Sequence, residues 1–186
     1  HATIGIVITT DGTITDLPRE AYPEAEGRVI EELKALGKPF LILLNSAHPQ
    51  GEAAQKLRAK LAEQYDVTCL AVSCLDLDQQ AVTEIIQAVL YEFPLEELQL
   101  FLPDWVETLP TEHPIRTALF QAIRAQAGKL VRIRDVKPAV AAMGQCELVT
   151  GASVTGMKLG SGCCQARLEL PRSLFYDTLS QQTGFA

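Results

Sequence analysis

Three near-continuous apolar runs, each followed by a segment with helical spacing of apolar residues, fill the first 94 residues and limit the possible folds. Strands that are buried on both faces and alternate with helices pair in parallel through right-handed crossovers. The strands are expected at Ile4–Ile8, Phe40–Leu44 and Val67–Val72, and the helices from about Pro23 to Leu36, Glu52 to Tyr65 and Gln79 to Phe93. The pattern predicts an α/β structure with a three-stranded parallel sheet.

Each predicted helix carries an apolar stripe that is expected to pack on the sheet. Pro23 suits a first helical turn, and Gly37 is placed to end the first helix. The stripes are Val29, Ile30, Leu33 and Leu36 in the first helix, Ala54, Leu57 and Leu61 in the second, and Val82, Ile85, Ile86, Val89 and Leu90 in the third.

The pattern changes after Pro94, which predicts a first domain over residues 1–94 and a smaller α+β domain over residues 95–186. Gly160-Ser161-Gly162 is a natural hairpin turn between two strands. The expected elements are strands at Leu98–Leu102, Glu147–Leu159 and Cys163–Leu170, and helices at Pro114–Ile133, Val136–Met143 and Leu174–Ser180.

Composition narrows the class of protein. The net charge of -7 argues against nonspecific nucleic-acid binding, which requires cations, and against attraction to an anionic membrane. No apolar run is long enough to span a membrane, and the first residues do not have the pattern of a signal peptide. The five cysteines are odd in number and contain no C-x-x-C pair, so we expect free thiols in a reducing cytosol.

Polar residues follow each predicted strand of the first domain. Open parallel sheets bind ligands at the carboxyl ends of their strands, and these ends are Thr10-Asp11-Gly12, Asn45-Ser46-Ala47-His48 and Ser73-Cys74. GTPase-like proteins carry N-K-x-D after the second of these strands and a Ser-Ala pair after the third. Asn45 keeps the asparagine, Ser46 replaces the lysine, and His48 replaces the aspartate.

The replaced aspartate changes the expected base preference. A neutral imidazole offers one acceptor, whereas a carboxylate accepts a bidentate, charge-assisted pair of hydrogen bonds. Guanine selectivity should therefore be weak, and adenine becomes plausible. From the residues alone, a nucleotide pocket formed by Asn45, Ser46, His48, Ser73 and Cys74 stands beside a plainer alternative, in which Asn45 caps a loop and His48 is solvated.

Two further polar residues have structural interpretations. Asp11 could touch a metal ion, but its position before Gly12 favours a turn-forming role. His113 precedes Pro114 at a helix start and is expected at the surface. The phosphate-loop pattern G-x-x-x-x-G-K-[ST] does not occur in the 186 residues, and no catalytic residue or metal ligand is assigned.

Longer motifs carry a family resemblance. The run TTDGTITDLPREAYPEAEGRVIEELKALGKPFLILLNS, together with VLYEFPLEEL, LPDWVETL and RIRDVKPAV, closely resembles the stage IV sporulation protein A family of endospore-forming bacteria. The resemblance covers essentially the whole chain and is more specific in the first half than after about Gly144. The family is a group of morphogenetic ATPases related to translation-factor GTPases.

The resemblance implies a fold and a function. Residues 1–94 would be the C-terminal half of a P-loop GTPase-like three-layer α/β/α domain, with the phosphate loop and Mg²⁺-binding aspartate before His1. The parent would bind ATP with Mg²⁺, hydrolyse it and polymerise into the basement layer of the spore coat. It would lie in the mother-cell cytoplasm at the outer forespore membrane, held by a small amphipathic peptide, and other coat morphogenetic proteins would build on it.

Three functional hypotheses remain. The first is a fragment of this ATPase that is inactive by itself, because the phosphate-binding loop is missing. The second is an assembly module that self-associates through the unpaired edge of Thr3–Ile8. The third is a GTPase-related translation or ribosome factor, which the residues Ser46 and His48 and the acidic charge argue against.

Overall fold

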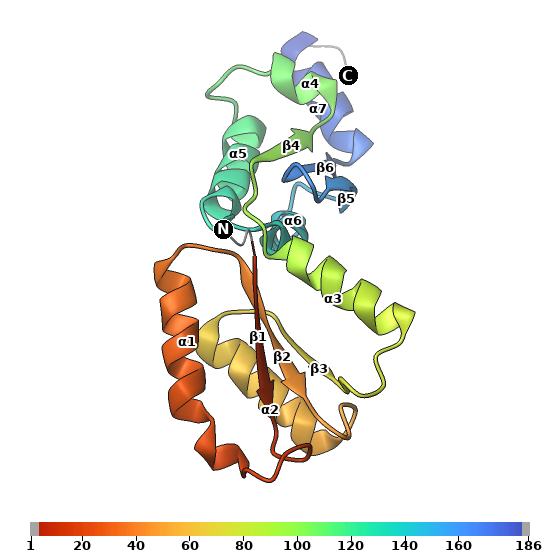
Figure 1. Cartoon of the computed structure of the whole chain (residues 1–186). Helices are drawn as coiled ribbons and strands as arrows, with labels where there is room; N and C mark the ends of the chain where they lie inside the picture. The colour runs from red at the N-terminus through yellow and green to blue at the C-terminus, as the bar shows by residue number, and fades with distance from the viewer. Residues whose placement is uncertain (1–3, 184–186) are drawn as a thin grey trace. The chain divides into compact units, whose positions relative to one another are not determined.

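The chain forms two compact units, His1–Glu92 and Phe93–Ala186, each of which is described by itself (Figure 1). The computed structural model describes residues 4–183. Each unit contains one three-stranded sheet.

The first unit contains the expected alternation of strands and helices. All three strands are parallel, in the order β1-β2-β3, and Thr10 lies opposite Asn45 at the carboxyl edge. The elements are β1 Gly5–Thr10, a 3₁₀ turn at Arg19–Ala21, α1 Pro23–Ala35, β2 Phe40–Asn45, α2 Glu52–Tyr65, β3 Cys69–Val72 and α3 Gln79–Tyr91. The α/β class and the parallel sheet are confirmed.

Helices cover both faces of this sheet (Figure 1). Ile30 of α1 and Leu61 of α2 pack with β2 residues Ile42 and Leu44 on one face. On the opposite face, α3 supplies Ile85, which packs against the other β2 side chains, Leu41 and Leu43, and against β3. The central strand is therefore an apolar run with no polar alternation because both of its faces are buried.

The predicted apolar stripes are only partly buried. Ile30 is fully buried, whereas Val29 is 41% exposed and Leu36 is 65% exposed. On α3, Ile85 is buried, but Val82 is 43% and Ile86 is 53% exposed. The helical period identified the correct face of each helix, but one sheet of three strands is too narrow to cover the whole stripe.

The second unit is an α+β structure with a mixed sheet. Its order is β4-β6-β5, in which β4 and β6 are parallel and β5 and β6 form an antiparallel hairpin. The elements are β4 Glu97–Phe101, α4 Asp104–Thr108, α5 Pro114–Ala127, a 3₁₀ turn at Ile133–Asp135, α6 Val136–Met143, β5 Gly151–Lys158, β6 Cys163–Glu169 and α7 Arg172–Thr183. The core is formed by Val106, Leu119, Met143 and Leu168.

Two predicted elements of the second unit are too long. The helix expected to run to Ile133 ends at Ala127, with Gly128 as its C-cap. The Asp135 carboxylate then accepts the backbone N–H groups of Val131 and Arg132, at 3.1 and 2.8 Å, and stabilises a separate turn. The strand expected from Glu147 begins only at Gly151.

The hairpin turn requires a glycine at one position. Gly162 has φ +67°, and a Cβ there would lie 2.8 Å from the carbonyl oxygen of Pro94. This turn was predicted from the sequence, but the close approach of Pro94 depends on the parallel β4–β6 pairing.

All five cysteines are free thiols. Cys69 and Cys164 are buried, and Cys163 is only partly buried, as strand alternation predicts for the adjacent pair. Burial raises the pKa of the Cys69 thiol to about 11 because the thiolate would lose its hydration. The expectation of free thiols is confirmed.

Candidate functional site

The candidate site is the carboxyl edge of the first sheet, where three loops follow the three parallel strands. The Asn45 side-chain carbonyl accepts the backbone N–H of Cys74 at 2.9 Å and thereby joins the loop after β2 to the loop after β3. The backbone N–H of Ser46 also donates to the Val72 carbonyl at 2.9 Å. Asn45 therefore braces two loops.

A second set of hydrogen bonds joins the loop after β1 to the loop after β2. The Asp11 carboxylate accepts the backbone N–H and the hydroxyl of Thr13, at 3.0 and 2.5 Å, and it also bonds the hydroxyl of the buried Ser46. The Thr13 hydroxyl in turn accepts the N–H of Ala47 at 2.9 Å. All three loops are therefore linked through side chains.

The ionisation of Asp11 reflects this network. Burial raises the pKa of its carboxyl group, but the hydrogen bonds from Ser46 and Thr13 together outweigh that effect and hold the pKa below 3.8. Asp11 is thus an ionised turn residue at neutral pH. This arrangement agrees with the turn-forming interpretation of Asp11.

A buried ion pair between Arg19 and Glu26 supports the loop that follows β1. Arg19 donates to both carboxylate oxygens of Glu26, at 2.7 and 3.0 Å, and the two side chains are only 17% and 3% exposed. The same guanidinium donates to the Thr9 hydroxyl at 2.9 Å and to the Thr10 carbonyl at 3.3 Å. Arg19 therefore fixes the end of β1 just before Asp11.

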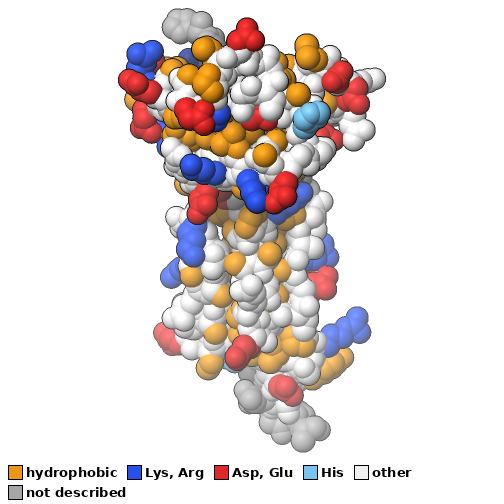
Figure 2. Space-filling model, turned by 90° about the horizontal axis from the view of Figure 1, so that it is seen from below, with side chains coloured by type: hydrophobic (Ala, Val, Ile, Leu, Met, Phe, Trp, Pro, Cys, Tyr) orange, Lys and Arg blue, Asp and Glu red, His pale blue; other side chains and the backbone are white. Residues whose placement is uncertain are grey.

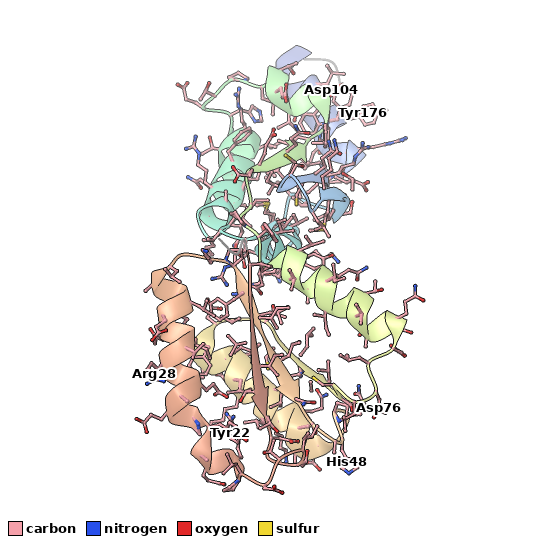
Figure 3. All side chains as sticks on the ribbon, in the orientation of Figure 1. Tyr22, Arg28, His48, Asp76, Asp104 and Tyr176 are labelled. Atoms are coloured by element: carbon pink, nitrogen blue, oxygen red, sulfur yellow. The ribbon has the colours of Figure 1, made fainter. Side chains whose placement is uncertain are left out.

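The five sequence-predicted site residues lie in these linked loops, but they are not equivalent. Asn45, Ser46 and Cys74 belong to the hydrogen-bonded frame, in which the Ser46 hydroxyl also accepts the N–H of His48 at 3.0 Å. The His48 side chain is exposed. Figure 3 shows His48 and Asp76 at the end of the sheet toward which the strands run.

Sequence reasoning missed two residues of this edge. Thr13 connects two loops, and Asp76 accepts a hydrogen bond from the Ser73 hydroxyl at 3.0 Å. In the sequence, only the position of Asp76 three residues after Ser73 indicates their contact, because this spacing is typical of a local side-chain hydrogen bond in a turn. Thr13 gave no signal, because its partner Ala47 is 34 residues away.

His113, outside this edge, has a structural role. It is half-buried as the N-cap of α5, where its Nδ1 atom accepts the backbone N–H of Ile115 at 3.3 Å. Over residues 4–183, no group of three or more His, Cys, Asp or Glu side chains is placed to hold a metal ion. The same part of the chain contains no helix both long enough and apolar enough to cross a membrane.

The fold and the site define the first unit as an α/β protein with an open parallel sheet and a hydrogen-bonded polar edge at its strand ends, the position at which this class binds ligands. The family model of the stage IV sporulation protein A ATPase domain matches residues 1–94 of the sequence. The family model of the middle domain of the same protein family matches residues 95–186. The chain belongs to the stage IV sporulation protein A family.

Curated relatives agree with these domain matches. The chain is 36% identical over 185 residues to stage IV sporulation protein A of Clostridioides difficile, covering 100% of this chain and 38% of the relative. It is 38% identical over 184 residues to the Bacillus subtilis protein and to the Bacillus anthracis protein, covering 99% of this chain and 37% of each relative. The chain thus spans less than two fifths of these relatives. No solved structure gives a significant match.

Proposed function

We propose that residues 1–94 form the base-side half of an ATP-binding domain of the P-loop, GTPase-like kind. The observation that carries the proposal is the 2.9 Å bond from the Cys74 N–H to the Asn45 side chain. An asparagine that braces the loops after two neighbouring parallel strands is the arrangement expected of the N-K-x-D asparagine. The family match of residues 1–94 to an ATPase domain supports the same proposal.

In this proposal the longer protein binds and hydrolyses ATP with Mg²⁺, and hydrolysis drives self-assembly of the basement layer of the spore coat at the forespore surface. Asn45, Ser46, His48, Ser73 and Cys74 would hold and position the base. Residues 4–183 do not offer a fitting set of metal ligands, so we assign no Mg²⁺ ligand to this chain.

The proposed partners follow from the family resemblance. They are further copies of the protein, a small amphipathic peptide that anchors it to the membrane indirectly, and other coat morphogenetic proteins in the mother-cell cytoplasm. Nucleic acid is not among them, since the net charge of -7 opposes binding to phosphate backbones.

Photolabelling tests the assignment of the base site. A full-length protein carrying this chain is expected to be labelled by 8-azido-ATP in the peptides that contain Asn45–His48 and Ser73–Cys74, and excess ATP should abolish the labelling. Labelling confined to other peptides would contradict the proposal. Competition by GTP in preference to ATP would instead favour a GTPase-related translation or ribosome factor.

The 186-residue chain by itself should hydrolyse no ATP above background. A phosphate loop supplies the cradle of backbone N–H groups and the lysine that bind the β- and γ-phosphates, and this sequence lacks the motif. Phosphate release by the purified chain should equal that of a mock purification, while the full-length protein turns over. Turnover by the purified, contaminant-free chain above that background would disprove its predicted inactivity.

Self-association is a second candidate function. It is favoured by apolar side chains of the edge strand β1 that remain exposed in the first sheet. Ile6 lies opposite Leu41 and Ile8 opposite Leu43, so these isoleucines extend the sheet face that α3 covers. Yet Ile6 is 46% and Ile8 is 62% exposed. β1 is also an edge strand among the described residues, and an unpaired apolar edge invites pairing with another chain. Thr3 lies outside the described residues.

Figure 2 shows acidic and basic side chains interspersed with hydrophobic ones on the face that it draws, so no charge of one sign dominates that face. Because β1 combines an unpaired edge with exposed isoleucines, we expect the 186-residue chain to form dimers or larger species through β1 in sedimentation at high concentration. Ile8→Lys should shift it toward monomer, whereas the matched change Leu36→Lys, at the 65% exposed C-cap residue of α1, should not. A wild-type chain that stays monomeric would rule out this function.

A further inference from the structure

The loop that follows β2 has its first three backbone donors engaged within the protein. The N–H of Ser46 donates to the Val72 carbonyl at 2.9 Å, and the N–H of His48 donates to the Ser46 hydroxyl at 3.0 Å. Between them, the N–H of Ala47 donates to the Thr13 hydroxyl at 2.9 Å. A phosphate-binding loop needs backbone N–H groups that are free to bind an anion. This loop therefore suits the base side of a nucleotide site and not the phosphate side.

One of the three acceptors comes from a distant part of the chain. The contact between Ser46 and Val72 continues the β2–β3 ladder, and the contact between Ser46 and His48 is local. The Thr13 hydroxyl, in contrast, belongs to the loop after β1 and lies 34 residues before Ala47. Only this side chain ties the backbone at Ala47 to another loop, so the conformation of the loop depends on where Thr13 is held.

The turn that carries Thr13 is fixed, although Thr13 itself is exposed. Gly12 has φ +88°, and a Cβ there would lie 3.0 Å from the backbone nitrogen of Arg19. The Gly12 N–H donates to the Thr10 hydroxyl at 3.1 Å. The Asp11 carboxylate accepts both the N–H and the hydroxyl of Thr13. Because a hydroxyl has one proton and two lone pairs, donation to Asp11 leaves the Thr13 oxygen as an acceptor for Ala47.

We propose that Thr13 is a positioning residue for nucleotide binding, whose hydroxyl, oriented by Asp11, holds the Ser46–His48 loop in the conformation that accepts the base. Ala47 lies between Ser46 and His48, two of the residues proposed to hold the base. Thr13 acts through the Ala47 N–H and does not touch the nucleotide. This inference rests on the proposed ATP-binding function and adds to it a residue from the neighbouring loop.

The test measures steady-state ATP hydrolysis by a full-length protein carrying this chain, and its inhibition by inorganic tripolyphosphate, which has no base. Thr13→Val keeps the branched shape and removes the acceptor of the Ala47 N–H. It should raise KM for ATP by about two- to tenfold, the range for one neutral hydrogen bond. The kcat should stay nearly unchanged, because contacts to the base are the same in the ground state and the transition state. The inhibition constant of tripolyphosphate should not change.

A rescue variant and a matched control accompany this change. Thr13→Ser keeps the hydroxyl and should restore KM to within about twofold of the wild type, less than the loss of one hydrogen bond. Thr83→Val is the same substitution at an exposed threonine of α3, whose hydroxyl donates to the Gln79 carbonyl of its own helix at 2.8 Å. It should leave KM, kcat and tripolyphosphate inhibition as in the wild type.

A double variant tests whether Asp11 acts through Thr13. Asp11→Ala alone should also raise KM for ATP, because the Thr13 hydroxyl loses the group that orients it. Since both residues belong to one chain of hydrogen bonds, Asp11→Ala/Thr13→Val should raise KM by less than the product of the two single increases. Increases that multiply fully would show that the two residues act independently and would contradict the proposed role of Asp11.

The remaining outcomes separate the inference from the proposed function, once circular dichroism has shown that the variants are folded. If the wild type hydrolyses ATP and Thr13→Val has the wild-type KM, the inference is wrong and the proposed function stands. A fall in kcat, an equal loss of tripolyphosphate inhibition, or failure of Thr13→Ser to restore KM would also overturn it, because each indicates a general structural defect. If the wild type neither binds nor hydrolyses ATP, the proposed function itself fails.

Discussion

Replacing Arg19 with alanine should lower the free energy of unfolding of the first unit by about 3–5 kcal/mol, the usual cost of removing one partner of a buried ion pair. The Glu26 carboxylate is 3% exposed and would lose both hydrogen bonds from the guanidinium. The hydroxyl of Thr9 and the carbonyl of Thr10 would lose the same donor. Urea denaturation followed by circular dichroism measures the change.

Arg28→Ala is the matched control, because Arg28 is an exposed arginine of the same unit, labelled in Figure 3. A change within about 0.5 kcal/mol is expected there. The double variant Arg19→Met/Glu26→Leu should be more stable than Arg19→Ala, since it leaves no buried charge unpaired. Equal stability of Arg19→Ala and Arg28→Ala would contradict the structural role of the ion pair.

Replacing Leu119 with alanine should destabilise the second unit by about 2–5 kcal/mol, the range for truncating a fully buried leucine. Leu119 of α5 is 0% exposed and packs in a cluster with Val106, Met143 and Leu168. These partners come from α4, α6 and β6, so the cavity would open where three elements meet. Thermal and urea unfolding give the loss of stability.

The control for this second change is Leu179→Ala, at a leucine of α7 that is 45% exposed. Its effect should stay near or below about 1 kcal/mol, because nearly half of the side-chain surface stays exposed to water in the folded state. If both leucine variants lose the same stability, Leu119 is not at the centre of the core.

The candidate site shows how far sequence reasoning extends. The strand ends were predictable, because an apolar run followed by a polar turn marks the point at which a buried strand leaves the sheet. Asn45 was therefore found before its partner was known. Asp76 was missed, because its hydrogen bond from the Ser73 hydroxyl is a side-chain contact that the motif does not contain. The role of His48 in a base pocket stays a prediction, and only the structure showed that its side chain is exposed.

The sequence by itself determined the order and type of the longer elements, the parallel sheet of the first unit and the hairpin of the second, because these depend on local periodicity and turn chemistry. It did not predict the short helix α4 or the two 3₁₀ turns. Only the tertiary structure decided which apolar residues stay exposed, as at Ile8 and Ile86, and which charges are buried, as at Glu26. It also decided that β4 pairs in parallel with β6. These outcomes depend on contacts between distant segments, which no local pattern records.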